Sequence, residues 1–211
     1  GETPMDAVLF FPFLGAAVLL TIMPGPDNLF VLAQSIAQGK NAGIATAFGL
    51  CTGLIAHVSA ATLGVSAVIY QSAVMFSIVK YAGAAYLLYL AWKSFRAKDS
   101  GLSVDQVPVR KLKDLYKRGI VMNVLNPKVS LFFLALLPQF VDPSSGSVTV
   151  QMLMLGLTFI VQALLIFCAI SIFAGKIRNF LLKDSRLGRK LNVFQGVLFV
   201  IIGLNIAVSE N

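Results

Sequence analysis

Charged side chains are scarce in this chain of 211 residues. They make up 12% of it, whereas hydrophobic residues make up 57% and the mean hydropathy is +0.83. A soluble domain carries about 25% charged residues, because its surface faces water. The composition therefore excludes a soluble globule, and it also excludes a disordered chain, a disulfide-stapled secreted fold and a nucleic-acid-binding protein. The sequence predicts an integral membrane protein.

Residues that bind metals or carry out catalysis are also few. One histidine and two isolated cysteines are too few for a transition-metal site. The sequence has no Gly-x-Ser-x-Gly motif, no His-Glu-x-x-His motif and no glycine-rich phosphate loop. We therefore expect no enzyme, no cofactor and no bound metal. The remaining sources of work are an ion gradient or a substrate gradient alone.

The charges stand in blocks that leave long uncharged stretches between them. No Asp, Glu, Lys or Arg occurs from Asn41 to Val79 or from Pro143 to Gly175. A membrane span needs about 20 apolar residues, so the first stretch predicts two spans joined by a turn at Tyr70-Gln71-Ser72. The same reading predicts an all-α protein with six transmembrane helices, at roughly 8–36, 42–69, 73–95, 119–140, 148–174 and 191–208.

Lysine and arginine lie on one side of these six spans. The connection between spans 1 and 2 has one, that between spans 3 and 4 has eight, and that between spans 5 and 6 has six. The other connections and both termini have none. Basic residues stay on the cytoplasmic side, so we predict a multi-pass protein with both termini outside. Apolar residues at helical spacing within 109–118 predict a short interfacial helix on anionic lipid, with a regulatory-partner site as the alternative.

Proline breaks stand at matched places in the two halves of the chain. Residues 24–28 (PGPDN) interrupt the first span and residues 126–128 (NPK) interrupt the fourth. Three spans reverse direction, so the halves would form a 3+3 inverted-topology repeat, in which matched breaks indicate a midplane site; packing kinks are the alternative. We predict a single transmembrane domain over 1–211, with repeat 1 at about 8–95, a basic cytoplasmic connection at 96–118 and repeat 2 at about 119–208.

Two charges inside the broken spans mark the candidate site. Asp27 is the only carboxylate inside any span, and an Asp or Lys at the centre of a membrane helix costs about 2.5–3.5 kcal/mol. Asp27 and Lys128 both fall roughly 14–16 Å from the cytoplasmic face, near the middle of the membrane. A permanent Asp27–Lys128 ion pair that holds the halves together is the alternative to a functional role.

His57 and Asn123 are predicted to lie behind the site. Histidine titrates near neutrality and could relay protons, although a hydrogen-bonded core histidine is the alternative. The residues predicted to bind substrate or proton directly are Pro24, Gly25, Pro26, Asp27, Asn28, Asn126, Pro127 and Lys128.

Several segments resemble the LysE/RhtB family of bacterial amino-acid exporters. They are residues 24–32 (PGPDNLFVL), 83–93 (GAAYLLYLAWK), 123–133 (NVLNPKVSLFF) and 137–141 (LPQFV). The resemblance covers nearly the whole chain. It implies a carrier of the bacterial cytoplasmic membrane that exports amino acids or similar small metabolites and is driven by the proton gradient.

We therefore expect an alternating-access antiporter with its site between spans 1 and 4. Asp27 would bind the substrate ammonium or a proton, but not both, and Lys128 would face the substrate carboxylate. A single intramembrane acid favours a neutral amino acid over lysine, which brings a second positive charge. The alternatives are a divalent metal-ion exporter and a non-transporting membrane scaffold or sensor subunit. A homodimer is one assembly open to so small a carrier, although no sequence feature marks its interface.

Overall fold

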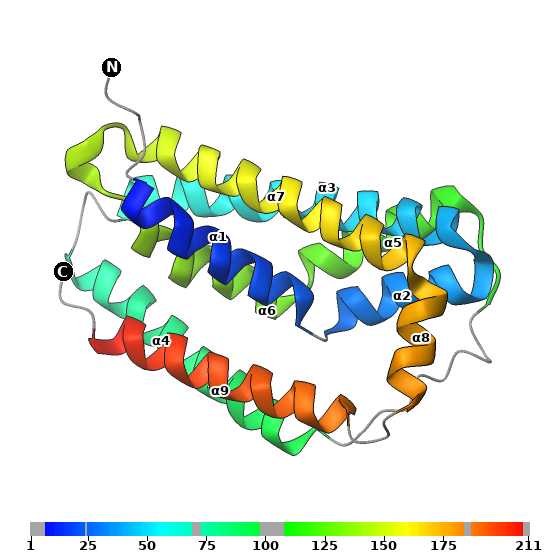
Figure 1. The fold of residues 1–211 in the computed structure, drawn as a ribbon. Helices are drawn as coiled ribbons and strands as arrows, with labels where there is room; N and C mark the ends of the chain where they lie inside the picture. Colours follow the sequence, from blue (N-terminus) through cyan, green and yellow to red (C-terminus); the bar gives the residue numbers. More distant parts are fainter. Residues whose placement is uncertain (1–6, 24, 69–72, 98–107, 184–186, 209–211) are drawn as a thin grey trace.

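The protein is described from a computed structural model that places residues 7–23, 25–68, 73–97, 108–183 and 187–208. Every regular element in these ranges is helical, which confirms the all-α prediction (Figure 1). A π-helical turn, η1 (Phe132–Leu136), and two 3-10 turns, η2 (Leu137–Phe140) and η3 (Pro143–Ser145), follow α6. The α-helices are α1 (Ala7–Ile22), α2 (Pro26–Gln38), α3 (Lys40–Val68), α4 (Ala73–Arg96), α5 (Leu112–Val124), α6 (Pro127–Leu131), α7 (Val148–Ile172), α8 (Ala174–Lys183) and α9 (Leu187–Val208).

Both predicted broken helices are present. The axes of α1 and α2 differ by 53°, and α5 and the segment from Pro127 to Phe140 differ by 49°. Pro26 and Pro127 stand in the first turns of α2 and α6. Proline lacks an N–H and suits the start of a helix, where that N–H would have no partner within the helix. Each proline therefore ends one helix and starts the next at a new angle.

The fourth predicted span is more irregular than its sequence suggests. After five α-helical residues the chain widens into η1 and then tightens into η2. Pro138 stands in η2 and cannot donate the hydrogen bond that would continue an α-helix. The apolar pattern of residues 119–140 gives no sign of these changes in helical pitch.

Length and composition support several membrane crossings. Two helices are long and apolar enough to cross alone, at Lys40–Gly64 and Val148–Ile172. Each bent pair passes the same test when its two parts are taken together, which gives up to four crossings among the described residues. Helices α4 and α9 occupy the places of the third and sixth predicted spans. The full count of six remains a prediction.

Two boundaries correct the sequence-based expectations. No separate interfacial helix covers residues 109–118, because α5 begins at Leu112 and runs without a break into the fourth span. Leu115 and Gly119 of this helix are buried against the protein rather than facing outward. The amphipathic helix α8 was not anticipated, because its ten residues are too short and too basic to read as a span. The predicted turn at 70–72 lies outside the described residues.

Helices of the first half pack against helices of the second half. Helix α3 of the first half packs along α5 and α7 of the second, while α1 and α2 pack against α7. Helices α4 and α9, which stand at the third and sixth predicted spans, pack along each other at the lower edge of Figure 1. Helix α5 approaches α3 so closely that a Cβ on Gly119 would lie 2.7 Å from the carbonyl oxygen of Thr46. Glycine is therefore required where these two backbones meet.

Candidate functional site

The two helix breaks meet at one cavity of about 30 Å³. A single water needs about 10–15 Å³ by this measure, so the cavity has room for roughly two waters and not for a metabolite. Its polar lining comes from both breaks and consists of Thr21, Gly25, Asp27, Asn28, Asn123, Asn126 and Lys128. Its apolar lining consists of Leu20, Met23, Pro26, Leu54, Val129, Phe159, Ala163 and Phe167.

Asp27 lies in the first turn of α2 and is 8% exposed. Its Oδ2 accepts a hydrogen bond from Nδ2 of Asn123 at 3.2 Å, whereas its Oδ1 is buried without a hydrogen-bond partner. The N-terminal end of a helix favours a negative charge. The carboxyl group is therefore held through one oxygen, while its other oxygen is buried without a hydrogen-bond partner.

Lys128 lies in the first turn of α6, across the cavity from the end of α1. Its ammonium donates to the carbonyl oxygen of Leu20 at 3.2 Å and lies 5.9 Å from the centre of the Phe199 ring. A cation is favourable at the C-terminal end of a helix, where carbonyl groups have no partner. Among the residues described, Asp27 and Lys128 form no ion pair within 4.0 Å. The geometry thus differs from a direct structural ion pair between the halves.

Asn28 closes the C-terminal end of α1 from the far side of the break. Its Nδ2 lies 2.7 Å from the carbonyl oxygen of Thr21, 3.1 Å from that of Ile22 and 2.8 Å from that of Met23. The two N–H groups of this amide are therefore shared among three carbonyls. The last carbonyls of a helix lack partners within it, so Asn28 stabilises the break.

His57 of α3 supports the second break from behind. Its Nε2 lies 2.9 Å from the carbonyl oxygen of Asn123 and must donate, because a carbonyl oxygen only accepts. Asn123 in turn donates from its side chain to Asp27. Asn126 caps α6 by accepting from the amide of Lys128 at 3.1 Å. His57, Asn123 and Asp27 thus form one connected series of hydrogen bonds from α3 to the cavity.

The structure brings most of the predicted site residues together. Six of them line the cavity: Gly25, Pro26, Asp27, Asn28, Asn126 and Lys128. Pro127 starts α6 beside the lining, and Pro24 lies outside the described residues. Of the two residues predicted to lie behind the site, Asn123 lines the cavity itself and His57 lies behind it.

Sequence reasoning missed the contributions of α1 and α7. Thr21 lines the cavity, and its Oγ1 accepts from Nε2 of Gln162 on α7 at 2.9 Å. Phe159, Ala163 and Phe167 form the α7 side of the cavity. These residues stand in uniformly apolar stretches, where residues that face lipid and residues that face a cavity look alike.

Metal-ligating side chains do not gather around the cavity. Over the ranges that the structure covers, no three His, Cys, Asp or Glu residues lie close enough together to hold a metal ion. Cys51 is buried and Cys168 half-buried, and both are free thiols.

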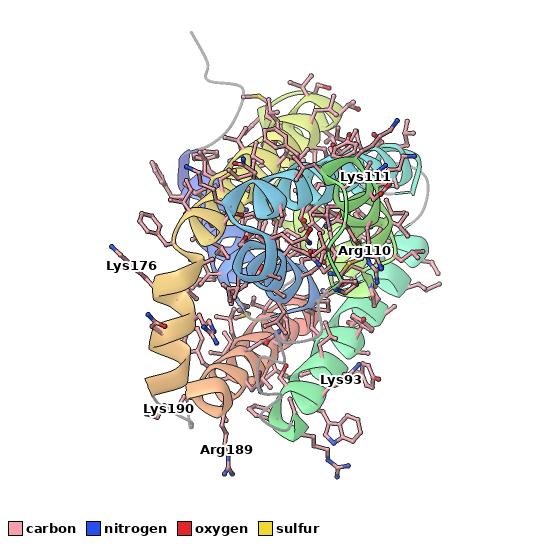
Figure 2. All side chains as sticks on the ribbon, turned by 90° about the vertical axis from the view of Figure 1, so that its right-hand side faces the viewer. Lys93, Arg110, Lys111, Lys176, Arg189 and Lys190 are labelled. Carbon is pink, nitrogen blue, oxygen red and sulfur yellow. The ribbon has the colours of Figure 1, made fainter. Side chains whose placement is uncertain are left out.

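Basic side chains gather at one end of the molecule. Helix α2 ends, α5 begins and α8 lies at the right of Figure 1, whereas α1 and α7 begin and α9 ends at the left. Figure 2 looks onto the right-hand end, where the labelled and exposed basic residues are Lys93, Arg110, Lys111, Lys176, Arg189 and Lys190. These six residues of the predicted basic connections thus lie at one end of the fold.

The model of one protein family matches nearly the whole chain. The LysE type translocator family matches residues 18–210. The chain belongs to this family. The resemblance inferred from the sequence segments is therefore confirmed, and family membership indicates a membrane transport protein.

Relatives of this LysE type translocator match it over their full lengths. The uncharacterized membrane protein YrhP of Bacillus subtilis (strain 168) is 31% identical, over 93% of this chain and 97% of its own. A homoserine/homoserine lactone efflux protein of Salmonella typhimurium is 31% identical, over 96% and 97%. An uncharacterized membrane protein of Vibrio cholerae is 25% identical, over 98% and 100%. No solved structure matches the chain significantly.

Proposed function

We propose that this LysE type translocator exports small neutral amino acids in exchange for protons, through the cavity between the two helix breaks. The observation that carries the proposal is the buried Asp27, a cavity-lining residue whose Oδ1 has no hydrogen-bond partner. An unpaired buried acceptor costs free energy. A proton or a substrate ammonium would satisfy it, and each would exclude the other.

Charge complementarity supports an amino acid as the substrate. Asp27 and Lys128 are the only ionisable residues among the described residues that line the cavity. A zwitterion carries one ammonium and one carboxylate, so Asp27 would hold the first and Lys128 the second, after leaving the carbonyl of Leu20. The name of the Salmonella relative, an efflux protein for homoserine and its lactone, agrees with a small uncharged side chain.

Competition at Asp27 supplies the coupling. In the inward-open state, substrate ammonium displaces the proton and is carried outward. At the outer face, a proton replaces the ammonium, and the protonated carrier returns. Because the cavity of about 30 Å³ is too small for an amino acid, the described conformation must open before substrate binds.

The packing of each half against the other supports an alternating-access mechanism. In a 3+3 inverted repeat, the first span of each half should pack against the second span of the other half in the same way. Helices α5 and α3 form one such contact, and the α1–α2 pair with α7 forms the other. The proposal is thus a single transmembrane domain in which the two broken helices move relative to α3 and α7.

The basic end would face the cytoplasm of a bacterium. The labelled lysines and arginines of Figure 2 come from α4, α8, α9 and the start of α5. Positive residues remain on the cytoplasmic side, where they also contact anionic lipid. This orientation puts both termini outside and makes the carrier's export direction cytoplasm to exterior.

Efflux from proteoliposomes tests the proposal. Vesicles are loaded with labelled glycine, alanine, serine, homoserine and lysine, with and without a proton gradient. Removing one partner of a buried charged contact costs about 2–5 kcal/mol. Asp27→Asn is therefore expected to weaken proton-driven efflux at least about 30-fold, while Asp114→Asn, the same change at an exposed site on α5, leaves it intact.

Proton-driven efflux by Asp27→Asn at the wild-type rate would refute the coupling. Metal export is tested by the same vesicles loaded with divalent cations, although no metal-binding cluster occurs in the described residues. A scaffold role predicts that exchanging Asp27 and Lys128 preserves function. Our mechanism predicts that the exchange abolishes efflux.

A further inference from the structure

Helix α7 contributes three residues to the cavity, and all three are apolar. Phe159, Ala163 and Phe167 are 4%, 1% and 5% exposed. Residues four apart lie on the same face of an α-helix, so these side chains form one row along α7. Ala163 is in the middle of this row, and its side chain is the smallest of the three.

Phe159, one turn before Ala163, is closely packed. The ring of Phe159 lies 5.1 Å from that of Phe132 and 4.9 Å from that of Phe133, centre to centre. One turn earlier, Gly156 of α7 packs directly onto Val58 of α3. Interiors this closely packed do not shift without cost. The space beside the Ala163 methyl group is therefore set by fixed surroundings.

Once Asp27 and Lys128 bind the substrate ammonium and carboxylate, no charge among the described lining residues remains to pair with a charged substrate side chain. This step rests on the proposed function, in which Asp27 and Lys128 bind the two α-substituents. Every other lining residue that the structure places is uncharged, and a third charge in such a site would be buried without a partner. The substrate side chain must therefore be uncharged and must lie against an apolar surface.

We propose that Phe159, Ala163 and Phe167 form the subsite for the substrate side chain, and that the size of residue 163 limits the length of the side chain accepted. A hydrophobic site distinguishes substrates that differ by one methylene group by about 10- to 200-fold. Added methyl groups at residue 163 occupy the space that a longer substrate side chain would use. Removing the methyl group makes room for it.

Substrate ratios in one protein test the subsite independently of expression. Wild type, Ala163→Val and Ala163→Gly are reconstituted, and unlabelled glycine, serine, homoserine, leucine and lysine compete with labelled alanine. Ala163→Val should weaken homoserine relative to glycine at least about tenfold, and Ala163→Gly should strengthen leucine relative to glycine. Lysine should compete poorly throughout. Ala169→Val, the same change at an exposed position of α7, should leave every ratio unchanged.

The outcomes separate the subsite from the transport function. If wild type exports amino acids but neither Ala163 variant changes the ratios, the subsite is overturned and the transport proposal stands. If wild type exports neither alanine nor any of the five competing amino acids, the subsite and the transport proposal are both overturned. Because Ala163→Gly introduces no added atoms, it decides the question even if Ala163→Val does not fold. A shift in the glycine-to-leucine ratio with an unchanged proton dependence supports the subsite.

Discussion

Replacing Gly119 with alanine is expected to force α3 and α5 apart. A Cβ at this position would lie 2.7 Å from the carbonyl oxygen of Thr46 and 2.9 Å from the amide nitrogen of Leu50. Both are main-chain atoms of α3, so no side chain can rotate away. The helices must separate there by about 0.7 Å to reach the 3.4 Å of ordinary contact.

A control on the partner helix isolates this cost. Overpacking costs about 1–3 kcal/mol, whereas alanine is favoured over glycine in a helix by about 0.8–1 kcal/mol. Gly64 of α3 has open space around its Cβ position, so Gly64→Ala should gain the helix preference of alanine without an overpacking cost. The two variants should differ by about 1–3 kcal/mol. For a chain of this length, that difference corresponds to about 2–12 °C in melting temperature, with Gly119→Ala the less stable.

The same variant should impair transport. Asn123 stands one helical turn after Gly119, and its 3.2 Å hydrogen bond to Asp27 lengthens if α5 moves outward. Melting of both purified variants in one detergent, followed by efflux at a temperature where both are folded, measures the two effects. Equal melting temperatures for Gly119→Ala and Gly64→Ala would refute the account of the α3–α5 contact.

Two further changes test other contacts. Asn28→Ala leaves three carbonyls at the end of α1 without their donor, which should cost about 1–3 kcal/mol of stability and reduce efflux; an unchanged melting temperature would contradict the capping role. Outside the membrane, hydrogen bonds from Ser144 and Ser145 hold the pKa of Asp142 below its ordinary value of 3.8. The stabilisation from these bonds is complete above the unfolded pKa and is lost as the pH falls through the lower folded pKa. Ser144→Ala should raise the Asp142 pKa in a carboxyl NMR titration, and a fall would contradict the assignment.

Features that depend on charge or on proline could be predicted from the sequence. Uncharged stretches bounded by basic residues predicted helices close to those observed, for example α3 at Lys40–Val68 against 42–69. The two proline motifs predicted the breaks, because proline removes a helix N–H and clashes with the carbonyl group four residues back. Asp27 and Lys128 were identified because a charge within a membrane span is costly.

Features that depend on packing could not be predicted. The apolar residues of α7 look alike along the chain, so Ala163 was not distinguished from residues such as Ala169 that face outward. Helix α5 was expected to start later, because Leu112 follows basic residues typical of a connection. The π-helical turn after α6 begins at Phe132, and no periodic pattern in the sequence indicates it.

The small volume of the cavity has a consequence for when the carrier works. Under the proposed function, only molecules that have already opened can bind substrate, so the apparent dissociation constant is the intrinsic one divided by the open fraction. An open fraction of about 1% would weaken apparent affinity about 100-fold. A higher substrate concentration would then be needed to occupy the same share of the carrier molecules. The carrier would begin to export when the substrate accumulates, and the stability of the closed state would set that threshold.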